Sequence, residues 1–169
     1  MKTTAKINVA KIATCNSLSG LTELQYNLGY EAGTKDKLHI RISASNGNGK
    51  FNACWWSLAE IDQALAGFQV GAAFTASALK PVFAGRSVNT LYFVLAALLD
   101  YGVLSRAVPV EAGYVRNGTA ALISELQSLA EAGVNLVPDA MTEVEGHTVS
   151  PAAKAGKGAK KSAPSAKHA

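Results

Sequence analysis

The sequence predicts one α+β domain, in which a small antiparallel sheet of three or four strands precedes a helical half. Apolar and polar residues alternate with period two in the first third of the chain, as strands require. Capping residues and apolar residues at helical spacing follow from residue 57 onward. The chain has 169 residues, 49% hydrophobic and 17% charged, which suits a single globular domain. We assign this domain to residues 1–145 and a disordered basic tail, rich in lysine and alanine, to residues 146–169.

Three or four segments form the predicted sheet. Residues 22–30 alternate so regularly that one face of this strand should be buried, and residues 7–13 are the candidate for a fourth strand. Residues 38–43 alternate in the same way. The run Asn-Gly-Asn-Gly at 46–49 suits the positive φ angles of a tight hairpin. We therefore expect residues 50–56 to return as the next strand.

The helical half begins with a capping box at residues 57–60, where serine and glutamate can satisfy each other's backbone N–H groups. This box predicts a helix from residue 58 to about 66. Thr75 can cap a short helix over residues 76–79, because Pro81 disfavours helical geometry in the residue before it.

The longest and most apolar helix is predicted at residues 88–101, with Ser87 as its N-cap and Gly102 in the position of a left-handed C-cap. Residues 103–110 and 113–116 then indicate a short hairpin. An amphipathic helix begins at Thr119 and runs until Gly133; its apolar positions are Ala121, Leu122, Leu126, Leu129 and Ala130.

Signatures of catalysis and of metal binding are missing. The chain has three histidines: we expect His39 to lie with Arg41 on a solvated strand face, and His147 and His168 to lie in flexible sequence. We expect no enzymatic activity, no metal and no cofactor. The glycine run at 46–49 lacks the Gly-Lys-Ser/Thr ending and the helix of a phosphate-binding loop.

Isolated residue types have ordinary interpretations. Gly29 and Gly33 are interpreted as loop glycines, because they form no dinucleotide fingerprint. Cys15 and Cys54 lack metal-ligand spacing, and we expect buried free thiols. The longest apolar run, residues 91–99, is about half of the roughly 20 residues that cross a bilayer, so we expect no membrane contact. The N-terminus lacks the long apolar stretch of a signal peptide, and we expect a cytoplasmic protein.

The pair Trp55-Trp56 is more informative, because adjacent strand residues face opposite ways. One tryptophan should belong to the core. The other either anchors a ligand, stacks on a base of single-stranded nucleic acid together with Phe51, Tyr26 and Tyr30, or covers the second face of the sheet.

The segment from Thr75 to Arg116 has the element order helix, turn, helix, hairpin, and in outline it resembles the winged helix-turn-helix superfamily. That resemblance implies that the second helix enters the major groove of DNA. The residues facing base edges would be Arg86, Ser87, Asn89 and Thr90, and the hairpin residues contacting phosphates would be Arg106 and Arg116. The helix is apolar all round from residue 91 to 99, however, which is typical of a helix enclosed in a core.

The positive charge is unevenly divided. Residues 1–149 hold eleven lysines and arginines against twelve acids, whereas residues 150–169 hold five lysines and no acid. The composition of residues 150–169 resembles the C-terminal tails of linker histones and of bacterial histone-like proteins, which implies sequence-independent contact with nucleic acid. The five lysines are Lys154, Lys157, Lys160, Lys161 and Lys167. Neutralising five phosphates would give a log–log salt slope of up to about −4.5 on duplex DNA.

These observations favour a non-enzymatic accessory protein that associates with nucleic acid, DNA rather than RNA, through its tail. The winged-helix-like segment is a possible second DNA contact. The alternative is a protein-interaction or inhibitory module that binds a protein partner, or a second copy of itself, through its sheet or its apolar helix. In that alternative the tail only keeps the protein soluble.

Overall fold

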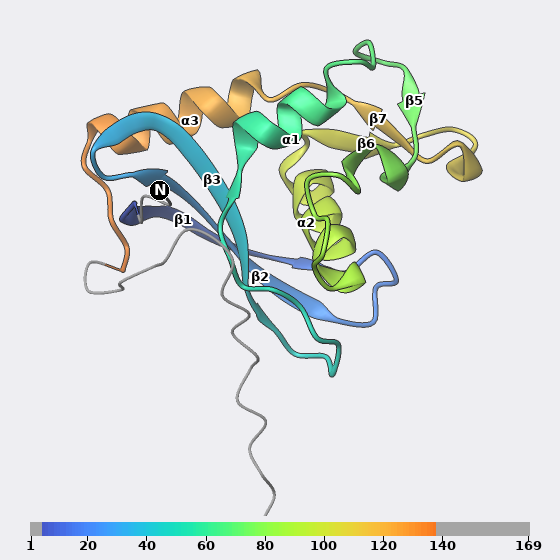
Figure 1. Ribbon diagram of the computed structural model, residues 1–169, viewed down its shortest axis with the longest axis horizontal. Coiled ribbons are helices and arrows are strands. Elements are labelled where there is room, and N and C mark those ends of the chain that lie inside the picture. Colours follow the sequence, from blue (N-terminus) through green and yellow to red (C-terminus); the bar gives the residue numbers. More distant parts are fainter. Residues whose placement is uncertain (1–4, 138–169) are drawn as a thin grey trace, which may run out of the picture.

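The computed structural model describes residues 5–137, and its fold is α+β. The predicted tail, with its five lysines, and both His147 and His168 lie outside the described residues. The first half of the chain forms a four-stranded antiparallel sheet with its strands in chain order (Figure 1). These strands are β1 (Ile7–Asn16), β2 (Glu23–Glu31), β3 (Thr34–Ser45) and β4 (Trp56–Ser57). The predicted antiparallel sheet is thus confirmed, with four strands.

The second half contains three α-helices, two short 3-10 helices and a second antiparallel sheet. The elements are α1 (Leu58–Leu65), β5 (Ala73–Phe74), η1 (Ala76–Leu79), α2 (Val88–Tyr101), β6 (Leu104–Arg106), η2 (Val110–Ala112), β7 (Tyr114–Arg116) and α3 (Ala120–Glu131). The second sheet has the order β5-β7-β6, so the last strand lies between the other two. The predicted helices at 76–79 and 88–101 have the predicted bounds.

Local capping chemistry sets two of the helix ends. Ser57 is the N-cap of α1, and its hydroxyl accepts a hydrogen bond from the Glu60 N–H at 3.3 Å, as the capping box predicts. Gly102 ends α2 with φ of 88°, a left-handed conformation that glycine adopts without steric cost. Ser87 occupies the N-cap of α2, but its side chain makes no capping hydrogen bond. The hydroxyl of Ser87 instead donates to the carbonyl oxygen of Lys50.

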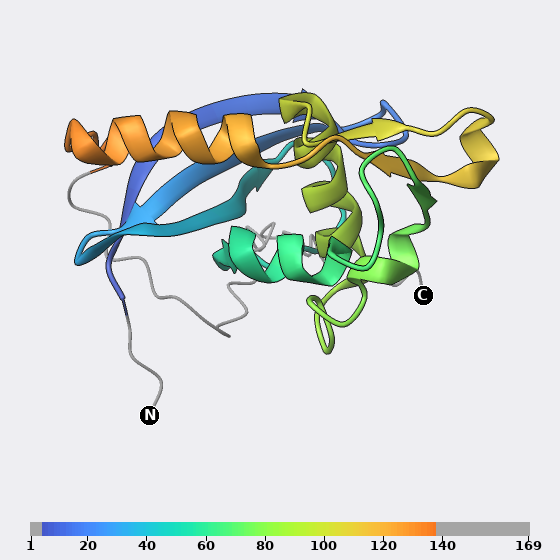
Figure 2. The same cartoon turned by 90° about the horizontal axis from the view of Figure 1, so that it is seen from above.

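The three α-helices lie on one side of the four-stranded sheet (Figures 1 and 2). Helix α2 packs against β1 and β3 of the large sheet and also against η1 and β6. Its buried residues are Thr90, Leu91, Val94, Leu95, Ala96, Ala97 and Leu98. The helix is therefore the centre of the core, as its apolar sequence predicts. No helix within residues 5–137 has the length and apolarity needed to cross a bilayer.

The opposite face of the sheet has a smaller core of its own. Trp55 is 4% exposed there and packs with Ile7 and Val9, while Trp56 belongs to the main core. The guanidinium of Arg41 lies 4.7 Å from the centre of the Trp55 ring. Of the three roles considered for the second tryptophan, the structure supports the one in which it covers the second face of the sheet.

Gly29 lies in the middle of β2 under this small core, so its interpretation as a loop glycine was wrong. A Cβ atom on Gly29 would be 2.6 Å from the carbonyl oxygen of Asn8 and 3.0 Å from the Trp55 ring. Only glycine lets the Asn8 carbonyl oxygen and the Trp55 ring lie this close to β2. Gly33 does lie in a turn, between β2 and β3.

The prediction of a returning strand over residues 50–56 was also wrong. Only Trp56 and Ser57 pair with β3, opposite Ile40 and His39. Residues 46–55 form no tight hairpin, because Lys50 and Asn52 bond to the first turn of α2 and not to β3. The tight connection in this sheet is instead the turn at residues 32–33.

Candidate nucleic-acid interface and pockets

The first turn of α2, which sequence reasoning assigned to base contacts, is bonded to the loop before β4. The Ser87 hydroxyl donates to the carbonyl oxygen of Lys50 at 2.7 Å, and the Asn89 side-chain amide donates to the same oxygen at 3.0 Å. Both side chains are half-buried. Two of the predicted base-reading residues therefore already hold an internal partner.

Thr90 is fully enclosed and forms a reciprocal pair with Asn52. The Asn52 N–H donates to the Thr90 hydroxyl oxygen at 2.9 Å, and that hydroxyl donates to Asn52 Oδ1 at 3.1 Å. The Ser87 N–H donates to the same Oδ1 at 2.9 Å. Thr90 and Asn52 are 0% and 4% exposed, so these hydrogen bonds lie in the interior. Thr90 is positioned to hold the loop on the helix.

The three predicted arginines take three separate partners. Arg86 lies over the Trp56 ring, with its guanidinium carbon 5.9 Å from the ring centre. Arg116 donates to the carboxylate of Asp62 at 2.7 Å, which joins β7 to α1. Their positive charges are used in contacts within the domain.

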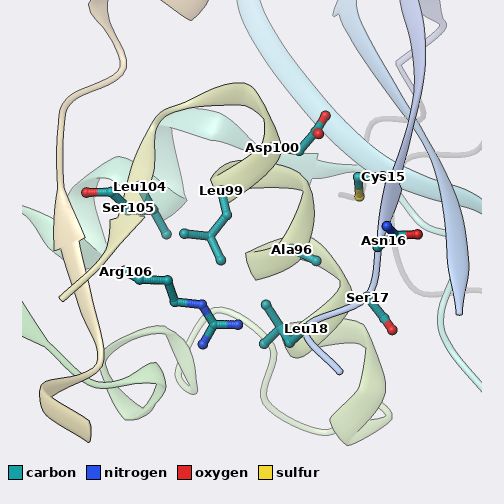
Figure 3. Close-up of a pocket in the computed structure, with 10 residues that line it drawn as sticks. All are labelled: Cys15, Asn16, Ser17, Leu18, Ala96, Leu99, Asp100, Leu104, Ser105 and Arg106. Carbon is teal, nitrogen blue, oxygen red and sulfur yellow. The ribbon is translucent and has the colours of Figure 1, made fainter. Parts of the chain in front are cut away.

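Arg106 is the exposed member of the predicted set. Its guanidinium carbon lies 5.4 Å from the centre of the Tyr114 ring. Figure 3 shows its side chain reaching from β6 across a pocket toward Leu18. This pocket lies between the end of β1, the last turns of α2 and β6, and has a volume of about 500 Å³. Its apolar lining includes Leu99 and Leu104.

The polar groups of this pocket do not form a nucleophilic site. The Asp100 carboxylate accepts from the Tyr26 hydroxyl at 2.8 Å, and burial followed by this hydrogen bond raises the pKa of Tyr26. Burial, followed by the charge of Asp100, raises the pKa of the Cys15 thiol to about 11. Cys15 is therefore protonated at neutral pH and is a poor nucleophile. Both Cys15 and Cys54 are buried thiols that belong to no disulfide within the described residues, as predicted.

No family model, curated protein or solved structure matches this chain. Within residues 5–137, no group of three or more His, Cys, Asp or Glu could hold a metal ion.

A second pocket, of about 620 Å³, lies beside the edge of the large sheet and the first turns of α1. Its polar lining includes His39, which the alternation of residues 38–43 placed on a solvated face. That expectation was wrong: His39 is 5% exposed, and its Nε2 lies 3.3 Å from Oε1 of Glu31. The partner comes from the neighbouring strand β2, so the strand's own alternation could not reveal it. The signal was the turn at 32–33, which folds Glu31 back beside β3.

Burial lowers the pKa of His39, and the attraction of Glu31 opposes this shift without cancelling it. The unfolded chain, with a histidine pKa near 6.5, therefore binds the proton more readily than the fold does. Stability should fall as the pH is lowered through about 6.5 toward the lower pKa of the folded state. Urea unfolding of the wild type and of His39→Gln between pH 5 and 8 checks this. The variant should lose less stability in that window, and equal losses in both chains would contradict the assignment.

Proposed function

We propose that the protein associates with nucleic acid without catalysing a reaction, and that Lys154, Lys157, Lys160, Lys161 and Lys167 make the principal contacts. The observation that carries this proposal is the division of charge: residues 150–169 hold five lysines and no acid, whereas residues 1–149 are close to neutral. Lysines that neutralise phosphates release counterions, which supplies affinity that does not depend on sequence. The globular domain would contact a partner or set the register of the protein on the nucleic acid.

Cationic side chains of the domain contact other groups of the domain, which supports the tail as the principal contact with nucleic acid. Three ion pairs occupy Lys11 with Glu125, Lys37 with Glu31 and Arg116 with Asp62. Three further cations, Arg41, Arg86 and Arg106, lie over aromatic rings. Phosphate contact by these six groups would compete with contacts inside the domain.

The winged-helix-like segment is a subsidiary part of the proposal. The order of η1, α2, β6 and β7 is the order on which that resemblance rests, and β5 joins the β6–β7 hairpin as a third strand. Because the first turn of α2 is bonded to Lys50 and Asn52, we assign to this segment only a phosphate contact by Arg106. The base contacts that the resemblance implies would require the hydrogen bonds between this turn and Lys50 and Asn52 to break.

A salt series on the full chain tests the proposal. Replacing the five lysines with glutamine should reduce the slope of log affinity against log salt on duplex DNA by up to about 4.5. Fluorescence anisotropy with a labelled DNA duplex and an RNA of the same sequence measures the slope. The matched control replaces five exposed lysines of the domain, Lys6, Lys35, Lys37, Lys50 and Lys80, with glutamine.

The control should change the slope less than the tail variant does, and Arg106→Gln should reduce it by about one at most. If the variant without the five tail lysines bound DNA with an unchanged salt slope, the tail would have no part in nucleic-acid binding.

The alternative function, protein interaction through the sheet or the apolar helix, has less support. Both surfaces are used inside the domain: seven residues of α2 are buried, and Trp55 covers the sheet face opposite the helices. Light scattering and a pull-down distinguish the two functions. A monomer that retains nucleic acid and captures no protein would leave the nucleic-acid proposal standing alone.

A further inference from the structure

The pocket between the end of β1, the last turns of α2 and β6 has the size and composition of a small-ligand site. Its volume of about 500 Å³ lies in the usual range of roughly 300–1,000 Å³. Leu18, Leu99 and Leu104 supply apolar surface, and polar residues at the end of β1 and on β6 complete the lining. Such a pocket suits a ligand that has apolar faces and polar edges.

Arg106 is the only cation among the ten residues that line this pocket. Its side chain crosses the pocket toward Leu18 and passes below Leu99 in the view of Figure 3. Within residues 5–137 the guanidinium belongs to no ion pair, and the group it contacts is the ring of Tyr114. A guanidinium can donate two parallel hydrogen bonds to the oxygens of a phosphate. The charge of the pocket at this end therefore fits an anionic group.

The one carboxylate of the pocket does not neutralise this arginine. Asp100 accepts from the Tyr26 hydroxyl at 2.8 Å, and Figure 3 shows its carboxylate turned away from Arg106. The hydroxyls of Ser17 and Ser105 also have partners outside the pocket. The guanidinium is therefore the charged group that remains for a ligand.

An exposed aromatic side chain lies on the same face of α2 as the pocket. Tyr92 is 39% exposed, and it precedes Ala96 and Leu99, which line the pocket, by four and seven residues. Residues at these spacings share one face of an α-helix. Exposed aromatic rings are the platforms on which bases of single-stranded nucleic acid stack. The pocket and Tyr92 thus form one surface with positions for two neighbouring bases.

We propose that this pocket binds a nucleotide of single-stranded DNA, with an unstacked base against its leucines and the phosphate on Arg106. Tyr92 stacks on the base of the adjacent nucleotide. A base inside a duplex is paired and stacked, and taking it out costs a few kcal/mol, so the pocket favours single strands. This inference rests on the proposed function, because the tail lysines attract nucleic acid of any form and the domain then adds the preference for single strands.

Titration of the full chain with adenosine monophosphate tests the pocket without involving the tail. The methyl resonances of Leu18, Leu99 and Leu104 should shift, and they should also shift in the chain whose five tail lysines are replaced with glutamine. Adenosine and ribose 5-phosphate, which lack the phosphate and the base, should each bind at least about fivefold more weakly. Equal binding of ribose 5-phosphate and adenosine monophosphate would overturn the proposal, since the pocket would then only attract an anion.

Leu18→Asp should weaken binding of a labelled single-stranded oligo(dA) by about fivefold or more, with a smaller effect on a duplex. Leu21→Asp is the matched control, because Leu21 belongs to the same turn, is 88% exposed and does not line the pocket. Both variants add the same charge. Equal weakening of oligo(dA) binding by the two variants would overturn the proposal.

Two further variants leave the packing of the pocket walls intact. Arg106→Gln, at an exposed side chain, should make adenosine monophosphate and adenosine bind alike, and a preserved preference for the phosphate would contradict the role of Arg106. Tyr92→Leu should weaken oligo(dA) binding by about fivefold or more while leaving adenosine monophosphate binding unchanged. If oligo(dA) did not displace adenosine monophosphate, the pocket would be a site for free nucleotides, and its place in strand binding would be overturned.

The two proposals fail separately. If adenosine monophosphate shifts the pocket resonances while the chain without the five tail lysines binds DNA as the wild type does, the tail function fails and the pocket stands. If nucleic acid binds through the lysines while adenosine monophosphate leaves the pocket resonances unchanged, the pocket fails and the tail function stands.

Discussion

Replacing Gly29 with alanine is expected to lower the free energy of unfolding by about 2–3 kcal/mol, the upper part of the range for overpacked cores. The added Cβ would lie 2.6 Å from the carbonyl oxygen of Asn8 and 2.7 Å from Cγ2 of Ile7. The first of these atoms belongs to the backbone of β1, so a side-chain rotation cannot relieve the contact. Strand β1 must move away from β2, and the Trp55 ring, 3.0 Å from the added Cβ, must shift as well.

Gly33→Ala is the matched control, since Gly33 ends the same hairpin and a Cβ there would meet nothing within 4 Å. Its free energy of unfolding should stay within about 0.5 kcal/mol of the wild type or rise slightly, because alanine restricts the unfolded chain. Urea unfolding monitored by tryptophan fluorescence measures both variants. Equal stability of the two variants would mean that the close approach of β1 to Gly29 is not a constraint.

The elements that sequence reasoning located best are those with signals inside a few neighbouring residues. Helix α2 begins after Ser87 and ends at Gly102, and η1 follows Thr75, each with the predicted bounds. The capping box at Ser57 likewise set the start of α1. Caps, proline and helical periodicity act over one or two turns, so one stretch of sequence contains all the information they need.

The predictions that failed depended on partners far away in the sequence. Residues 50–56 have the composition of a strand, but Asn52 bonds to Thr90, 38 residues later, and the ladder with β3 is limited to Trp56 and Ser57. Gly29 is required by Asn8 and Trp55, and no local pattern marks that approach.

The candidate site shows the same limit. The six domain residues of the predicted DNA contact were chosen by element order, which the structure has, but their side-chain partners come from Lys50, Asn52, Asp62 and two aromatic rings. His39 alternates like a solvated strand residue, yet it is buried and contacts Glu31 on the neighbouring strand. The uneven charge of residues 1–149 and 150–169, by contrast, could be counted directly from the sequence.

Thr90→Val is expected to lower the free energy of unfolding by about 2–3 kcal/mol. Valine has nearly the shape of threonine but lacks the hydroxyl, which here accepts from the Asn52 N–H at 2.9 Å and donates to Asn52 Oδ1 at 3.1 Å. The variant leaves that N–H unpaired at a site where both residues are almost fully buried, and an unpaired buried donor costs about 1–3 kcal/mol. The loop over residues 50–55 should loosen from α2.

Asn89→Ala is the control at the same helix turn, because it removes an exposed hydrogen bond to Lys50 and should cost at most about 1 kcal/mol. Urea unfolding measures both variants, and a double-mutant cycle of Thr90→Val with Asn52→Ala should give a coupling free energy of about 1 kcal/mol or more. The same two variants also separate structure from DNA reading. If Thr90 and Asn89 contact bases, each variant should weaken DNA binding while the free energy of unfolding changes little. If they hold the loop, Thr90→Val should lower the free energy of unfolding, and the salt dependence of DNA binding should still be set by the tail lysines.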